Sequence, residues 1–381
     1  MIIIAMLALG VAQSAAPQEE PSPPEQNSIV VIGRRPADTA TALARCLAQR
    51  CPAREDVALS LAHAQTQLIA GDYHGSRRTL LAARGRNKGY AKELPTDVGD
   101  LHRANARVAS LNGLRDASRA GVFDVVDALK AGLPKGDGRI LVARLEVGAA
   151  FARNGQLRAA LDQYDRVARD AHKRGETRVE GLALFQTAAL LAAVASEYPP
   201  YVRSARAAAA KVERSTTPEW APFRDAVRVI PAIIGPARDR PRLLDEAVRG
   251  MAPRPPGEPF LLYSPAVDFS SQGLTAGDRT EWVDLRYRIA QNGTVADVST
   301  VRSSDGAHRS WIALATEALH GRRYAPQQLG PGEFGPLRTE RVSFVSDLTS
   351  ITRSRIPHRT SRRIDGLDLT GSTEPAASPA R

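Results

Sequence analysis

Residues 282–298, WVDLRYRIAQNGTVADV, decide the fold of the C-terminal part of this chain. In the first half, apolar residues alternate strictly with polar ones, which is the two-residue period of a half-buried strand. Val283, Leu285 and Tyr287 therefore share one face, and Asp284 and Arg286 share the other. The dipeptide Asn-Gly at 292–293 signals a hairpin, because a type I′ turn needs positive φ at both central residues. The stretch predicts a β-hairpin whose second strand runs over 294–301.

The residues after the hairpin predict a helix and then another strand. Residues 310–319 carry an apolar stripe at helical spacing, and Gly321 is a natural stop. Residues 340–348 alternate again, with Val342 and Phe344 on one face and polar side chains on the other. The order strand, strand, helix, strand indicates a small α+β module. A proline-rich segment at 253–259 separates this module from the chain before it.

Residues 55–250 have the pattern of a helical repeat domain. One helix ends at the turn Gly71-Asp72-Tyr73 and a second follows, and the same unit recurs around the turn at 154–157. Two helices joined by a tight glycine turn are the unit of a tetratricopeptide-type solenoid. The stretch 94–138 between these copies has irregular helical spacing. The predicted fold class is therefore α+β, with an all-α tetratricopeptide-like solenoid, or an irregular helical bundle, before the sheet module.

Several features of residues 258–349 follow one another as they do in a known family. The hairpin 287–298 (YRIAQNGTVADV) is followed, after the helix, by the run Arg322-Arg323-Tyr324-Ala325-Pro326. A linker rich in Gly and Pro then leads to a closing strand, ERVSFV at 340–345, and Tyr263-Ser264-Pro265 precedes the hairpin. This segment, about a quarter of the chain, resembles the TonB C-terminal domain of energy transducers.

The resemblance implies a binding mode and a partner. In that family a peptide from an outer-membrane TonB-dependent receptor adds as a strand to the exposed edge of the last strand. An unpaired strand edge offers free backbone donors and acceptors, so this mode is physically sound. Carried over, the peptide-binding edge lies near Arg341, Ser343 and Val345, with Tyr263 and Pro265 close to it. Tyr324 and Pro326 have a packing role.

This chain departs from the energy transducers in the region that precedes the sheet module. Those proteins have an inner-membrane helix and a long proline-rich spacer, whereas here a helical domain stands in the spacer's place. The transmission of force is therefore not implied, even where peptide binding is.

The N-terminus predicts export. Residues 2–11 form an apolar run too short to span a bilayer as a helix, and small residues follow it. We expect a signal peptide over 1–16 and a periplasmic protein, with inner-membrane anchoring if the segment is not cleaved. A disordered linker is predicted over 17–54. Within it, residues 29–33 (IVVIG) resemble a TonB box and suit strand addition either to another sheet or to the protein's own surface. A disordered tail is predicted over 350–381.

The two cysteines, Cys46 and Cys51, could form a disulfide in an exported chain. A spacing of five does not stack two side chains on one helical face, so the bond requires a turn or a helix end between them.

Composition and motifs argue against enzymatic catalysis and against nucleic-acid binding. The net charge of +11 comes mainly from arginines, which are interleaved with Asp and Glu along the chain. The sequence has no recognisable motif that would contact the bases of a nucleic acid. No phosphate loop, metalloprotease motif or zinc-type cysteine pair occurs, and the seven histidines stand singly. We therefore expect no cofactor, no metal and no enzymatic activity.

Two functions follow from these expectations. The first is a periplasmic TonB-related adaptor that captures a peptide by β-augmentation at the last strand, in support of transport across the outer membrane. The second is an envelope scaffold, unconnected with transport, whose tetratricopeptide-like helices bind protein partners. The sequence names neither the receptor nor the partner of the helices.

Overall fold

The fold is seen in a computed structural model, which describes residues 35–267, 280–330, 333–350 and 357–370. It is mostly helical, with small antiparallel sheets toward the C-terminus, and so belongs to the α+β class. The predicted signal peptide (1–16) and the TonB-box-like segment (29–33) lie outside the described residues.

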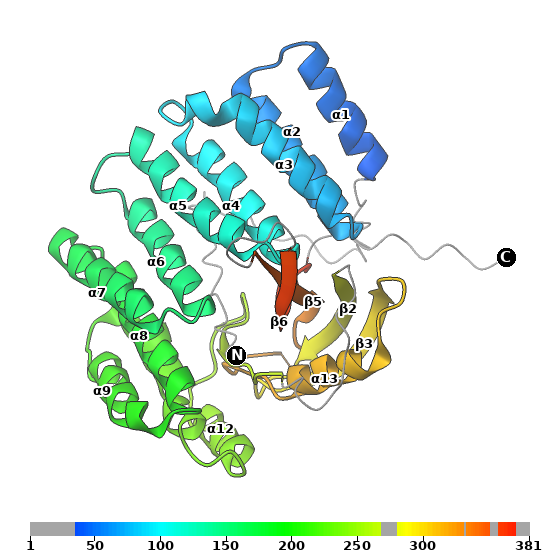
Figure 1. The fold of residues 1–381 in the computed structure, drawn as a ribbon. Helices are drawn as coiled ribbons and strands as arrows, with labels where there is room; N and C mark the ends of the chain where they lie inside the picture. The colour runs from blue at the N-terminus through cyan, green and yellow to red at the C-terminus, as the bar shows by residue number, and fades with distance from the viewer. Residues whose placement is uncertain (1–34, 268–279, 331–332, 351–356, 371–381) are drawn as a thin grey trace, which may run out of the picture.

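Eight long helices form four hairpins that stack side by side. The hairpins pair α2 with α3, α4 with α5, α6 with α7, and α8 with α9, and the second helix of each packs on the first helix of the next. Figure 1 shows them as an arc around the sheet. The bounds of all the α-helices before the sheet are α1 (Pro36–Ala48), α2 (Ala53–Ile69), α3 (Tyr73–Asn87), α4 (Pro95–Leu111), α5 (Arg115–Gly132), α6 (Gly138–Arg153), α7 (Leu157–Arg174), α8 (Thr177–Ala195), α9 (Val202–Glu213), α10 (Ala221–Val227), α11 (Ile230–Ile233) and α12 (Arg240–Arg249).

The first three hairpins turn at glycines that are 42 residues apart. Gly71, Gly113 and Gly155 all have φ between +73° and +87°, which is the left-handed cap that commonly ends helices. Each glycine N–H bonds to the carbonyl three residues earlier, and the next N–H bonds five residues back. The stretch 94–138, expected to be irregular, is thus a regular copy. The 42-residue period is longer than the roughly 34 residues of a tetratricopeptide repeat.

Helix α1 corrects the prediction of a disordered linker over 17–54, which is wrong from residue 36 onward. Its sequence PADTATALARCLA has proline in the first turn and buries Thr39, Leu43 and Cys46. Packing of this face against α2 stabilises a segment whose proline-rich flank suggested a linker. Cys46 and Cys51 form a disulfide across the turn between the two helices, with their Cα atoms 5.1 Å apart.

The C-terminal part holds a four-stranded antiparallel sheet in the order β3-β2-β5-β6 and a separate pair, β1-β4. The predicted succession of strand, strand, helix and strand is confirmed by β2, β3, α13 and β5. The disordered tail over 350–381 is wrong for residues 357–368, which form β6. The bounds are β1 (Leu261–Tyr263), β2 (Glu281–Ile289), β3 (Val295–Ser303), α13 (Arg309–His320), β4 (Arg323–Tyr324), β5 (Leu337–Ser350) and β6 (Pro357–Asp368).

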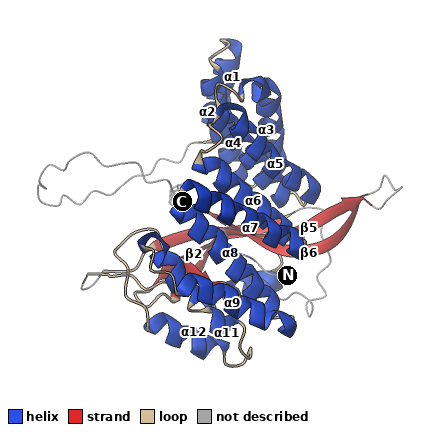
Figure 2. Cartoon of the chain, turned by 90° about the vertical axis from the view of Figure 1, so that its left-hand side faces the viewer, coloured by secondary structure: helices blue, strands red, loops and turns tan. Residues whose placement is uncertain are grey.

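Both faces of the central part of the sheet are covered by helices, as Figure 1 shows, whereas the far ends of β5 and β6 extend beyond the helices in Figure 2. The apolar face predicted from alternation packs on α13, where Trp311 stacks on Phe344 with ring centroids 5.7 Å apart. The opposite face packs on the first two helical hairpins, where Trp282 and Val345 join a core with Leu68, Leu101 and other residues of α2–α4. One of the hydrophobic core clusters is therefore shared by the main sheet and the first two helical hairpins.

The hairpin turn differs from the expected type I′ geometry. Gly293 has φ +79°, but Arg50 and Asp297 are the only described non-glycine residues with positive φ, so Asn292 does not adopt it. The Asn292 side chain instead accepts a hydrogen bond from the Thr294 N–H at 3.1 Å. Gly293 is required here for a second reason, because a Cβ atom would lie 2.0 Å from the carbonyl oxygen of Tyr324.

Candidate functional site

The predicted peptide-binding edge does not exist at β5. This strand pairs with β2 on one side and with β6 on the other, so its backbone groups are already bonded along both margins. Arg341, Ser343 and Val345 each have a relative exposure of 0%. The prediction was wrong because the chain supplies its own neighbouring strand, β6, from the segment expected to be a disordered tail.

Arg341 instead holds the sheet on the helical layer. Its guanidinium makes a two-point ion pair with Asp284, directly opposite on β2, at 2.7 and 2.9 Å. Its remaining N–H groups donate to the carbonyl oxygens of Leu68 and Ile69, at 2.6 and 2.8 Å. It also lies 3.8 Å from the ring centroid of Trp282. Each of the three guanidinium nitrogens of this buried cation has a hydrogen-bond partner, because the sheet and the end of α2 both supply acceptors.

The carbonyl groups that accept hydrogen bonds from Arg341 lie at the end of α2. Carbonyl groups at the end of α4 also accept hydrogen bonds from the sheet. The last carbonyls of a helix lack partners within the helix and carry its negative dipole. Arg363 of β6 donates to the Ser110 carbonyl at 2.7 Å, and the Leu348 N–H of β5 donates to the Gly113 carbonyl at 2.8 Å. The sheet thus caps two successive helical hairpins at equivalent positions.

Further contacts make the same interface specific. Tyr73, the first residue of α3, shares a hydrogen bond of 3.0 Å with the Ser343 hydroxyl. Burial raises the pKa of the Tyr73 phenol, so this group remains a neutral donor and acceptor at physiological pH. Gly71 and Gly113 touch the sheet so closely that a Cβ atom would lie 2.9 Å from the Trp282 indole nitrogen and 2.2 Å from the Ser346 carbonyl oxygen, respectively.

Asp365 of β6 anchors the outer side of this interface. It pairs with Arg363 at 2.5 Å and with Arg107 of α4 at 2.7 Å. Burial opposes ionisation of the carboxyl, but the two guanidinium groups prevail and hold its pKa at about 2.

A pH dependence of stability follows from that shift. Because the folded-state pKa lies below the unfolded value of about 3.9, the contribution is present above pH 4 and is lost as the pH falls toward 2. It amounts to about 2–3 kcal/mol at neutral pH, from about 1.4 kcal/mol per pKa unit. We expect the difference in unfolding free energy between the wild type and Asp365→Asn, measured in urea, to fall by about half at pH 3. A difference that does not change between pH 6 and pH 3 contradicts the assignment.

The other two predicted site residues lie on the opposite side of the sheet from Arg341. Tyr263 belongs to β1, which pairs with β4, and Pro265 packs against Gly321 at the end of α13. Between them, the Ser264 hydroxyl accepts a bond of 3.3 Å from Arg322. The structure therefore does not bring Tyr263 and Pro265 together with Arg341, Ser343 and Val345.

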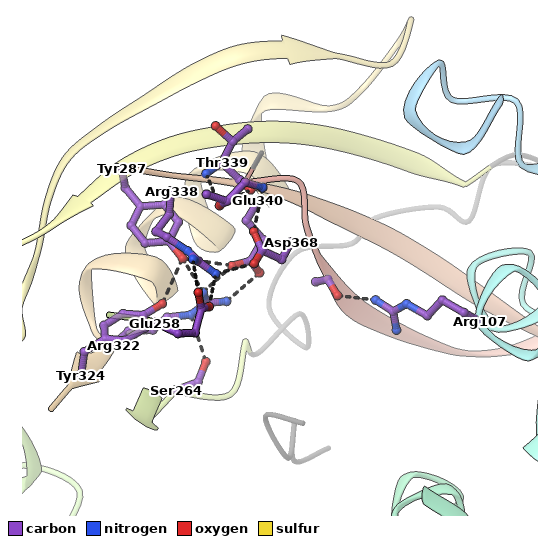
Figure 3. Close-up of polar contacts among 12 residues, drawn as sticks. Arg107, Glu258, Ser264, Tyr287, Arg322, Tyr324, Arg338, Thr339, Glu340 and Asp368 are labelled. Carbon is purple, nitrogen blue, oxygen red and sulfur yellow. Dashed lines mark hydrogen bonds and ion pairs between the residues drawn. The ribbon is translucent and has the colours of Figure 1, made fainter. Parts of the chain in front are cut away.

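Arg322 connects Ser264 with Glu340 of β5 in a buried network of charged and polar groups, which Figure 3 shows. Its guanidinium donates two hydrogen bonds to the Glu340 carboxylate, at 2.5 and 2.9 Å. Beside this ion pair, the Tyr287 and Tyr324 hydroxyls are hydrogen-bonded to each other at 2.9 Å. Burial opposes ionisation of Glu340, yet the ion pair with Arg322 lowers the pKa of this carboxyl. The side chain is only 12% exposed, so the network holds β4 and β5 together and presents no open carboxylate.

The two margins of the main sheet differ in regularity. On β3, the pairing register with β2 shifts twice, which twists that edge in the way that discourages strand addition. Strand β6 pairs only with β5 among the described residues, and its register is regular over residues 362–368. The Leu369 N–H donates to Thr339 of β5, so the backbone groups of Arg362 and Ile364, at the alternate positions, point outward.

A cavity is the remaining candidate site. It lies where α8 meets α10–α12 and β1, has a volume of about 140 Å³, and includes Tyr263 in its wall. In the described part of the chain, no three His, Cys, Asp or Glu side chains are grouped as metal ligands. Among the described helices, only α8 is long and apolar enough to cross a membrane. Of its most apolar 18-residue stretch, 56% is buried inside the protein.

The sequence contains one signal for this interface. Asp284 and Arg341 are opposite charges in the middle of two strands, and the register places them directly opposite each other. Such a pair at the centre of a sheet indicates a buried polar contact rather than a solvated face. The partners in the helical layer, Tyr73 and the carbonyls at the end of α2, had no comparable signal because backbone groups carry no sequence information.

Comparison with known proteins adds little. No protein-family model matches the chain, and no curated protein matches it significantly. A solved structure, BtubC (BKLC) from P. vanneervenii, is 14% identical with a TM-score of 0.41, covering 62% of this chain and 98% of that one.

Proposed function

We propose that the protein is a non-catalytic scaffold of the cell envelope that binds other proteins through its helical layer. The observation that carries this proposal is the interlocking of the two parts. The sheet fills the inner side of the helical arc, and its central strand β5 is bonded on both margins. A sheet committed to its own chain in this way suits a rigid support better than a peptide receptor that depends on the β5 edge.

The outer helices retain exposed apolar side chains that a protein partner could cover. Leu81 of α3 and Phe123 of α5 are 38% and 41% exposed. They lie beside the ion pair Arg84–Asp124, which joins the two helices at 3.0 Å. Repeat proteins stack short helical units into continuous binding surfaces, and the stacking of these helical hairpins supports the same use.

Two features support a location in the envelope. Residues 2–11 and the small residues behind them have the composition of a signal peptide, as argued above. The Cys46–Cys51 disulfide is a bond that persists in oxidising compartments such as the periplasm.

A second candidate is the TonB-related adaptor, moved to a different strand. The observation that favours it is the marginal position of β6, whose backbone groups at Arg362 and Ile364 point away from β5. An extended segment of a TonB-dependent receptor would add along residues 362–366 in this mode. Arg107 already donates to the carbonyl oxygen of Gly366, so the segment would have to displace that contact.

One experiment separates the two candidates. The full chain is immobilised and exposed to envelope extract, and retained proteins are quantified by mass spectrometry. The scaffold predicts that the double variant Leu81→Glu/Phe123→Glu loses its partners at least about fivefold, since each exposed apolar anchor contributes about 1 kcal/mol. It also predicts that Ile364→Pro, which removes an outward N–H of β6, retains them. The adaptor predicts the reverse, with specific loss of TonB-dependent receptors.

The matched control is Leu337→Glu, since Leu337 is 44% exposed but begins β5, away from the helical layer. Equal retention by all four proteins would contradict both candidates.

A further inference from the structure

The cavity between α8, α11, α12 and β1 combines apolar walls with two polar atoms that lack partners. Its walls are formed mainly by small and aliphatic side chains together with two aromatic rings, those of Phe185 and Tyr263. Six of the wall residues are Phe185, Ala189, Ala193, Ile230, Ile233 and Leu262. Gln186 and Arg240 also line it, and the Gln186 Oε1 and Arg240 Nε atoms are buried without a hydrogen-bond partner.

Arg240 has neither a hydrogen-bond partner for its buried Nε atom nor a carboxylate that neutralises its charge among the described residues. Within the described residues, the arginines on either side of Arg240 are both paired, Arg238 with Asp239 and Arg242 with Glu246, while no ion pair is found for Arg240. Glu197 also lines the cavity, but it is exposed and makes no bond to Arg240. A buried donor or charge without a partner costs free energy, which an incoming acceptor would recover.

The size of the cavity limits what can enter it. A volume of about 140 Å³ is similar to that of an engineered apolar cavity of about 150 Å³ in another protein, which takes up benzene. A body of about six to eight carbons therefore fits. The apolar walls favour a hydrocarbon body over a sugar or a nucleotide, and the Arg240 cation favours an anionic head group.

We propose that this cavity binds a small monocarboxylate with a hydrocarbon chain, whose carboxylate accepts a hydrogen bond from Arg240 and whose hydroxyl or amide N–H donates to Gln186. The proposal does not depend on the scaffold role, because the cavity is lined by α8, α10–α12 and β1, whereas Leu81 and Phe123 belong to α3 and α5.

The test is titration calorimetry on the full chain with monomeric octanoate, 2-hydroxyoctanoate, 3-hydroxyoctanoate, octanol and octylamine. We expect octanoate to bind at least about tenfold more tightly than octanol or octylamine, because a hydrogen bond to a charged group is worth about 1.5–3 kcal/mol. One of the two hydroxylated acids should bind better still, and Gln186→Leu should remove that gain. Equal binding of octanol or octylamine would overturn the proposal.

Variants test the residues directly. Arg240→Met keeps the length of the side chain but removes the charge, and should weaken octanoate binding at least about tenfold. Arg242→Met, on the same helix, is the matched control and should have no effect. Ala189→Leu fills part of the cavity and leaves Arg240 unchanged, and should also abolish binding if the ligand enters there. Unchanged binding by Arg240→Met or by Ala189→Leu contradicts the site.

The source of the carboxylate is resolved by a further arm. Vesicles of phosphatidylglycerol offer acyl chains and an anionic surface without a free carboxylate. We expect no binding to vesicles that depends on Arg240, whereas vesicle binding in the absence of octanoate binding would show a membrane-surface site and would overturn the proposal.

Discussion

Replacement of Asp284 by Ala should lower the free energy of unfolding by about 3–5 kcal/mol, which is the usual cost of removing one partner from a buried ion pair. Asp284 is 1% exposed and Arg341 is 0% exposed, so the substitution leaves a guanidinium buried without its counter-charge. Arg302, which pairs with the same carboxylate at 2.6 Å, loses its partner as well. The measurement is denaturant unfolding followed by circular dichroism.

Two comparisons make the Asp284 result specific. Asp116→Ala removes an exposed ion pair with Arg119. Because the Asp116 side chain is 87% exposed, the substitution should change the free energy of unfolding by less than about 0.5 kcal/mol. The double variant Asp284→Ala/Arg341→Met should lose less than the sum of the two single variants, because the two groups interact directly. A loss below about 1 kcal/mol for Asp284→Ala, or strict additivity, would show that the pair does not hold the interface.

The second large effect concerns the glycine turn that meets β5. We expect Gly113→Ala to cost about 3 kcal/mol. About 1 kcal/mol of this comes from the left-handed backbone, since φ is +74°, and the rest from the overlap of the new Cβ with the Ser346 carbonyl oxygen at 2.2 Å. Amide exchange of Leu348, whose N–H bonds to the Gly113 carbonyl, should accelerate in the same variant.

The repeat supplies its own control for this substitution. Gly155 occupies the equivalent turn with φ +73°, but a Cβ atom there would meet nothing within 4 Å. Gly155→Ala should therefore cost only the backbone contribution of about 1 kcal/mol. If both variants lose the same stability, the close approach between the helical turn and the sheet contributes nothing measurable.

The local pattern of the chain was readable wherever one face of an element is apolar. The alternation in 282–289 and 340–348 correctly assigned the faces of β2 and β5, and the stripe in 310–319 correctly gave α13. The glycine turns at 71 and 155 were recognised, although the third at 113, which fixes the 42-residue period, was not.

What the sequence did not reveal depends on contacts between distant segments. Strand β6 has only Ile364 and Leu367 as apolar residues in 357–368, so its stability comes from pairing with β5 and from the ion pairs of Arg363 and Asp365. The sequence predicted an exposed peptide-binding edge near the polar residues of β5, because the pairing of β6 along that edge is also a contact between distant segments. A polar face looks alike in sequence whether water or a helix terminus satisfies it.

The capping of early helices by late strands has a consequence for biosynthesis. Arg341 is separated from the Leu68 carbonyl by 273 positions along the chain. At the usual rate of about 5–20 residues per second, translation reaches that arginine roughly 14–55 s after the end of α2 has been made. During this interval the first two hairpins have their carbonyl ends and an apolar surface uncovered, so we expect the nascent chain to need protection by chaperones until its final strands emerge.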